Sequence, residues 1–168
     1  MNQICTNKEQ SSRLLEAGVR PETADMVLLY VDDESNIAPW EDIRKDEKGK
    51  FFYDVYGETY TLTESVLLRD SQYYDRSYQD DCPAWSLSKL IDMMPKSYQD
   101  DIDGMVYYLS GNFVELMYAS DWIEDGEGDN TYNCAKSFDK ENLMDNMVDA
   151  IEWLIREGHL NKKFLTDK

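Results

Sequence analysis

The sequence is short of the residues and motifs that mark common enzyme sites. It has one histidine, His159, and contains no glycine-rich phosphate loop, no dinucleotide fingerprint and no His-Glu-x-x-His pattern. A thiol nucleophile would therefore have one histidine available as its base, and we expect that residue just after a C-terminal helix, where it interacts favourably with the helix dipole. An enzyme is the less favoured interpretation, although a metal-dependent hydrolase stays open as an alternative.

Cysteine and long apolar runs are also scarce. The three cysteines, Cys5, Cys82 and Cys134, are far apart and form no Cys-x-x-Cys pair, which argues against a disulfide framework or a zinc knuckle. No apolar run approaches the ~18 residues of a membrane-spanning helix, and the first residues do not resemble a signal peptide. We expect a cytoplasmic protein that does not bind membranes.

Basic residues are too few to balance the acids. The 168 residues include 35 Asp and Glu against 17 Lys and Arg, a formal net charge of −18. A field of this sign repels nucleic acid and anionic membranes and attracts basic surfaces. The charge therefore predicts a basic protein surface as the partner and argues against direct nucleic-acid binding.

The composition is nevertheless that of a folded protein. Hydrophobic residues make up 42% of the chain and aromatic residues 12%, which is enough apolar mass to build a core. A chain of this length can bury roughly 70% of its unfolded surface. We expect one domain spanning residues 1–168, whose oligomeric state the sequence leaves open.

Helical periodicity occurs in three segments. Thr6 and Glu9 have the spacing of a capping box, Ser86 is a candidate N-cap, and Asp139 and Gly158 are expected to begin and end the last helix. The apolar positions recur at helical spacing in the third segment most regularly. The predicted helices cover residues 6–17, part of 83–94, and 139–157.

Strand-like runs rich in aromatic and β-branched residues form two predicted hairpins. Gly57 and Glu58 are compatible with a type II′ turn, and Ser110 and Gly111 with a second turn. Residues 32–50 are polar and predict a surface loop. The fold class expected is α+β, with a mainly antiparallel sheet of two hairpins packed against a long C-terminal helix and shorter helices. The predicted strands are residues 26–31, 51–56, 59–63, 105–109 and 112–119.

Residues 121–133 form an acidic, glycine-containing stretch that we expect to be a loop. A calcium loop begun at Asp125 would have Asn130 in place of its turn glycine and Lys136 in place of its bidentate glutamate. A solvated acidic loop is thus favoured over a weak calcium site, and no metal or cofactor is predicted. The acidic residues that we predict to contact a partner are Asp121, Glu124, Asp125, Glu127 and Asp129.

Several tyrosines lie in acidic, turn-like stretches. Residues 77–81 are repeated exactly as residues 97–101, for which coincidence or two similar acidic loops are favoured over a repeated ligand-binding loop. Amphipathic rings in such loops can anchor a protein interface or pack onto the protein's own sheet, and both explanations stay open. The candidate partner-binding residues here are Tyr73, Tyr74, Tyr78, Asp80, Asp81 and Tyr98.

The negative charge is concentrated in the middle of the chain. Residues 70–133 contain 14 acidic and three basic residues, a net charge of −11. We therefore predict a protein-interaction module that binds a basic partner surface. An alternative is a DNA mimic, because carboxylates spread along a surface can imitate phosphates and occupy a nucleic-acid-binding protein.

Three stretches carry a family resemblance: residues 11–26 (SSRLLEAGVRPETADM), 83–87 (PAWSL) and 149–155 (DAIEWLI). They resemble an uncharacterised group of small acidic proteins from Bacteroides-type gut bacteria and their phages or mobile elements. The resemblance implies a cytoplasmic protein, no particular activity and no catalytic residues. Its pattern also implies that Trp85 and Trp153 lie on helices, first as core residues and second as part of a partner groove.

Overall fold

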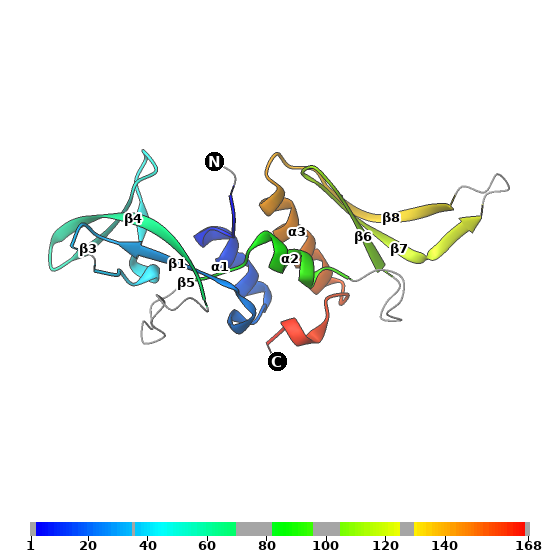
Figure 1. The fold of residues 1–168 in the computed structure, drawn as a ribbon, viewed down its shortest axis with the longest axis horizontal. Helices are drawn as coiled ribbons and strands as arrows, with labels where there is room; N and C mark the ends of the chain where they lie inside the picture. The colour runs from blue at the N-terminus through cyan, green and yellow to red at the C-terminus, as the bar shows by residue number, and fades with distance from the viewer. Residues whose placement is uncertain (1–2, 35, 70–81, 96–104, 125–129, 167–168) are drawn as a thin grey trace.

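The protein is elongated, with three α-helices between two antiparallel sheets (Figure 1). This computed structural model describes residues 3–34, 36–69, 82–95, 105–124 and 130–166, and for residues 119–124 and 130–133 it describes the backbone alone. The α+β class expected from the sequence is confirmed. The two predicted hairpins lie in different sheets, one at each end of the molecule.

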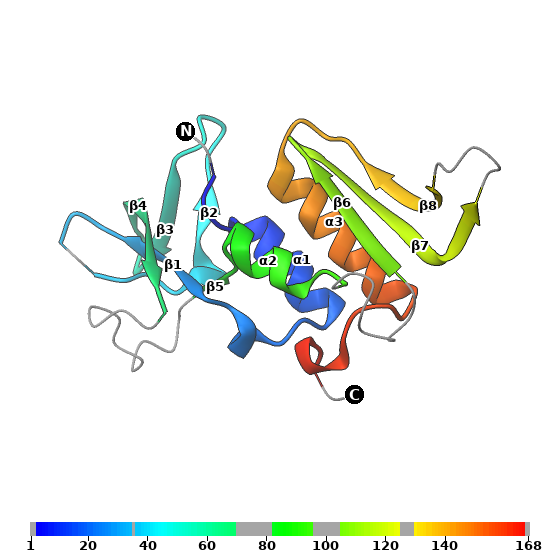
Figure 2. The ribbon, with the colours of Figure 1, turned by 45° about the vertical axis from the view of Figure 1, so that its right-hand side comes forward.

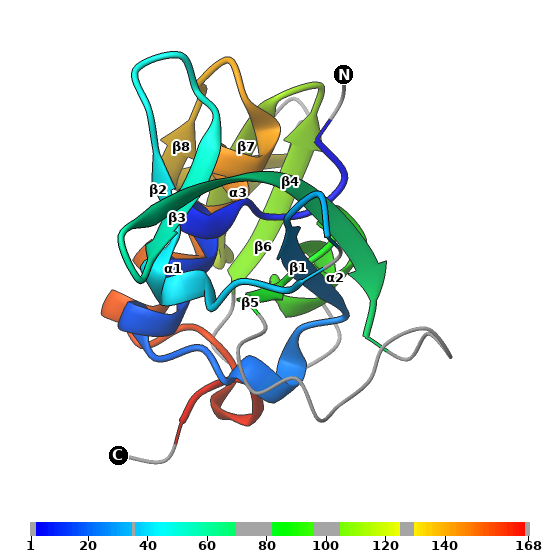
Figure 3. The same ribbon diagram turned by 90° about the vertical axis from the view of Figure 1, so that its left-hand side faces the viewer.

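A five-stranded sheet occupies one end, with strand order β2-β3-β4-β1-β5 (Figure 3). The first half of β4 pairs with β3, up to Leu62 opposite Phe51, and its second half pairs with β1 from Thr63 onward. The β3–β4 hairpin therefore extends beyond β1. The strands are β1 (Met26–Val31), β2 (Arg44–Lys45), β3 (Phe51–Val55), β4 (Glu58–Leu68) and β5 (Cys82–Ala84).

A three-stranded sheet at the other end has the order β6-β7-β8, with β6 Met105–Ser110, β7 Phe113–Glu124 and β8 Asn130–Phe138. The expectation of a loop over residues 121–133 is wrong, because β7 continues to Glu124 and β8 begins at Asn130. β6 pairs with β7 only as far as Tyr118. The last part of the β7–β8 hairpin thus extends past β6.

The helices are α1 (Lys8–Ala17), α2 (Leu87–Met93) and α3 (Leu143–Arg156), with short 3₁₀ turns η1 (Pro21–Thr23), η2 (Trp40–Asp42) and η3 (Lys162–Phe164). None of the described helices is both long and apolar enough to cross a membrane. Figure 2 shows the three helices side by side between the sheets.

The N-caps differ from those predicted at two of the three helices. Asn7, not Thr6, caps α1, because the Thr6 hydroxyl hydrogen-bonds Ser11 and accepts the backbone N–H of Trp85. Asn142, not Asp139, caps α3. The prediction of Ser86 as the cap of α2 is confirmed.

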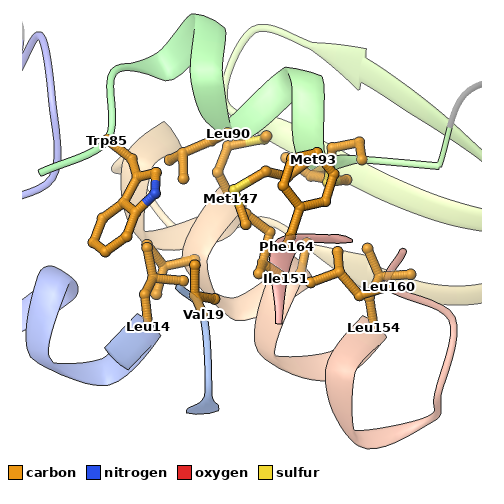
Figure 4. Packing of buried hydrophobic residues seen from close by; sticks show 14 of the residues in the cluster. Leu14, Val19, Trp85, Leu90, Met93, Met147, Ile151, Leu154, Leu160 and Phe164 are labelled. Carbon is orange, nitrogen blue, oxygen red and sulfur yellow. The ribbon is translucent and has the colours of Figure 1, made fainter. Parts of the chain in front are cut away.

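The larger hydrophobic core lies where the helices meet each other and the three-stranded sheet (Figure 4). Trp85, Leu90, Met147 and Ile151 are fully buried there. Trp85 lies between β5 and α2 rather than on a helix, and its indole N–H donates to the Thr23 hydroxyl at 3.0 Å. The first interpretation of Trp85, core packing, is confirmed.

A second hydrophobic core lies on one face of the five-stranded sheet. Tyr30 and Leu28 from β1 and Leu62 from β4 are buried with Ile43 from the segment between η2 and β2. The prediction of a surface loop over residues 32–50 is therefore wrong in part, because Ala38 and Ile43 are buried in this core and Arg44–Lys45 form β2. The apolar residues of this segment are isolated among polar ones and follow no helical or strand period, so the sequence did not indicate that they would be buried.

Candidate functional site

Most of the residues that the sequence predicts to contact a partner lie outside the described part of the chain. Their roles stay predictions. These residues are Tyr73, Tyr74, Tyr78, Asp80, Asp81, Tyr98, Asp125, Glu127 and Asp129.

The remaining two, Asp121 and Glu124, lie on β7 at the projecting end of the β7–β8 hairpin. Glu124 is opposite Asn130, and Ile123 is opposite Thr131, so the strands stay paired to the last described residues (Figure 2). Residues 121–129 contain five acidic and no basic residues. The backbone of β7 therefore places Asp121 and Glu124 at one end of the molecule, on a strand that extends past β6 rather than in a loop.

The other end of the molecule has a hairpin tip that sequence reasoning did not select. Val55 pairs with Glu58, so the two turn residues are Tyr56 and Gly57, with φ values of +51° and +85°. Two positive φ values are typical of a type I′ turn. The predicted type II′ turn at Gly57-Glu58 is thus wrong by one position, because the pairing register places Glu58 in the strand.

Tyr56 is in an unfavourable backbone conformation without any packing that would compensate for it. It is the one non-glycine residue with positive φ in the described chain, and its relative exposure is 102%. A left-handed conformation costs a side-chain-bearing residue roughly 1–2 kcal/mol, and Asn is the favoured residue before Gly in this turn. Strain of this kind is concentrated at functional sites.

Two further tyrosines line the hairpin below the turn. The rings of Tyr53 and Tyr60 pack across the strands with their centroids 5.4 Å apart. The Tyr60 hydroxyl donates to a carboxylate oxygen of Glu58 at 2.7 Å, which raises the pKa of Tyr60 to about 12. Burial and the nearby carboxylate of Asp32 raise the pKa of Tyr53. Both phenols therefore stay neutral at physiological pH and act as hydrogen-bond donors.

The carboxylate of Asp32 completes the charged surroundings of this hairpin. Backbone N–H groups of Asn36 and Glu34 donate to Asp32 Oδ1, both at 2.9 Å. These hydrogen bonds outweigh partial burial and lower the pKa of Asp32. We define the hairpin tip as residues 53–60. It contains three tyrosines, Asp54 and Glu58 but no basic residue, and Asp32 adds a further carboxylate near Tyr53.

The Cys5 and Cys134 thiols are not activated as nucleophiles. Burial raises the pKa of Cys5 to about 11, and a hydrogen bond with Glu115 raises that of Cys134. Both thiols are therefore protonated at neutral pH and weakly nucleophilic. His159 instead stacks on the Trp153 ring at 5.9 Å, just after α3.

Within the described residues, no group of three or more His, Cys, Asp or Glu side chains could hold a metal ion. No protein family, curated protein or solved structure matches this chain. Function must therefore be argued from its own surfaces.

The residues that sequence reasoning missed are Tyr53, Tyr56 and Tyr60. The sequence does contain a signal for Tyr56: this bulky aromatic residue directly precedes Gly57, where a hairpin turn favours Asn or Asp. The aromatic-rich run predicts only a strand, because β-strands are themselves rich in tyrosine.

Proposed function

We propose that the protein is an interaction module that binds a basic surface of a protein partner, and that the hairpin tip at residues 53–60 is one of its contact sites. The observation that carries this proposal is Tyr56, which is fully exposed and held in a left-handed conformation between two acidic residues. Tyrosine is enriched among the anchor residues of protein interfaces. A strained, unpacked tyrosine is explained by a partner that covers it.

The charges around Tyr56 define the partner. Asp54 and Glu58 are exposed on either side of the turn, and the whole chain carries a net charge of −18. A tyrosine ring beside carboxylates binds Lys or Arg side chains by combining cation–π attraction with ion pairing. The acidic end of the β7–β8 hairpin, with Asp121 and Glu124, would provide a second contact for a partner long enough to reach it.

The proposal is tested by affinity capture from a lysate of the native host, at low and at high salt, with wild type and Y56N compared by quantitative mass spectrometry. We expect a partner that is retained by wild type at low salt, reduced by Y56N, and lost at high salt, because ion pairs at a surface are screened. A set of captured proteins that is identical for wild type and Y56N would rule out the hairpin tip.

Two further measurements identify the kind of partner. Reversal of Glu124, Asp125, Glu127 and Asp129 to Lys should abolish capture if the β7–β8 end also makes contact. Duplex DNA added to the lysate should leave the partner bound, whereas release of a nucleic-acid-binding partner would instead support the DNA-mimic alternative. We expect this partner in the cytoplasm, since the three cysteines are free thiols.

A further inference from the structure

A cavity of about 370 Å³ lies between the start of α1 and the five-stranded sheet. Its apolar lining comes from Tyr30 on β1, Phe51 on β3 and Ile43 before β2. The rings of Tyr30 and Phe51 contact edge to face, with centroids 5.0 Å apart. This volume lies within the range of small-molecule sites, roughly 300–1,000 Å³.

The charged lining of the cavity does not follow the charge of the chain. Lys8, Arg44 and Lys45 face it, against two acids, Glu9 and Glu64. Acids outnumber bases about two to one in the whole sequence, at 35 to 17. The local balance is therefore reversed, and residues far apart in the chain produce this reversal.

One of the two acids already has a partner. A carboxylate oxygen of Glu64 accepts a hydrogen bond from the hydroxyl of Tyr30 at 3.1 Å, and Tyr30 is fully buried. Glu9 lies exposed in the first turn of α1.

The basic side chains are fixed in place and keep hydrogen-bonding capacity. Lys8 Nζ donates to the backbone carbonyls of Trp40 and Ile43, which leaves one of its three N–H groups. Arg44 uses only Nη1, which donates to the carbonyls of Glu41 and Ile43, and no described residue accepts from its Nε or Nη2.

The third basic group, Lys45, connects the charged and the apolar parts of the lining. Its ammonium lies 5.4 Å from the centre of the Phe51 ring. None of the three basic side chains forms a salt bridge with a described residue. Positive charge is thus available next to an aromatic wall.

We propose that this cavity binds a small organic anion, in which a carboxylate meets the three basic side chains and an apolar body of about one ring lies on the aromatic wall. A carboxylate accepts N–H donors from guanidinium and ammonium groups, and the apolar body replaces water on the half-buried Phe51 ring. This site is separate from the hairpin tip and does not depend on the function proposed above.

Two probes with one ring and opposite charge test the proposal: 3-phenylpropionate and phenethylamine, each titrated into the full-length protein and followed by amide NMR. We expect 3-phenylpropionate to shift the resonances of residues around the cavity with a dissociation constant of about 1 mM, as its size suggests. Phenethylamine should bind at least about tenfold more weakly. The overall charge favours the cation, so preference for the anion must come from the cavity.

Lys45 and Lys48 provide a matched pair of variants. Both are exposed, but only Lys45 lines the cavity. K45Q should weaken binding of 3-phenylpropionate by about threefold or more, whereas K48Q, which changes the net charge equally, should leave it unchanged. Equal weakening by both variants, tighter binding of phenethylamine, or no shifts up to about 10 mM of either probe would overturn the proposal.

Discussion

Replacement of Tyr56 by Asn should make the protein more stable and less able to bind its partner. Tyr56 has φ of +51° and is fully exposed, so its ring contributes no packing that the substitution would remove. Asn tolerates the left-handed region far better, and Asn-Gly is the preferred pair in a type I′ turn. Of a left-handed cost of roughly 1–2 kcal/mol, Y56N should recover about 0.5–1 kcal/mol.

The gain is measurable by urea denaturation. In a separate thermal unfolding experiment, a gain of about 1 kcal/mol would raise the Tm of a chain of this size by roughly 2–4 °C. The slope of the free energy against urea should be the same for both proteins, because an exposed tip residue changes the area exposed on unfolding very little. The unfolding midpoint of Y56N should therefore move to higher urea.

Tyr56→Phe is the matched control, since it keeps the ring and the backbone strain. Its stability should equal that of wild type within about 0.3 kcal/mol, and it should retain most of the partner binding. If Y56N were less stable than wild type, the ring would have to be packed on the protein, and the argument that Tyr56 is exposed for a partner would fail. If Y56N were more stable and bound the partner equally well, the strain would have no role in binding.

Three further predictions concern the contacts of α3. R13M should lower the free energy of unfolding by about 1 kcal/mol, because the guanidinium joins α1 to Asp149 and Glu152 on α3, each at 2.6 Å; in the same urea titration, R156M, which removes a more exposed salt bridge, should have almost no effect. N146L should lower the free energy of unfolding by about 2 kcal/mol, since the fully buried Asn146 side chain donates to two backbone carbonyls and accepts one N–H. An unchanged urea midpoint would show that these hydrogen bonds do not stabilise the fold. Burial alone would raise the pKa of Asp149, but hydrogen bonds from two basic side chains lower it below its ordinary 3.8. Its folded pKa is thus below its unfolded pKa, so the stability that wild type has over D149N should be complete above about pH 5 and should decrease as the pH falls through the folded pKa, which stability curves at several pH values would measure.

Elements with a strong local signal were predicted well. The helix over 139–157 is present as Leu143–Arg156, and the strand over 26–31 as Met26–Val31. An amphipathic period or an unbroken apolar run is fixed by the residues themselves. The boundaries were less accurate, because caps are chosen by competition: Thr6 was already engaged by Ser11 and Trp85, which left Asn7 to cap α1.

Elements that depend on distant partners were missed. β5 has three residues and contains Pro83, which a strand tolerates at the edge of a sheet, where β5 lies beside β1. β8 is polar and its pairing with β7 shifts register twice, so it has no regular alternation that would reveal it. Each forms a strand because a neighbouring strand offers hydrogen bonds.

The sequence by itself determined the acidic charge, the amphipathic helices and the presence of two hairpins, because these follow from composition and from local spacing. The tertiary structure alone decided that the two predicted hairpins belong to different sheets, that the β3–β4 and β7–β8 hairpins project from opposite ends, and that Tyr56 occupies the turn between β3 and β4. It also brought Lys8 beside Arg44 and Lys45 around one cavity. Local periodicity specifies which face of an element is apolar, but which faces meet is decided by packing between segments far apart in the chain.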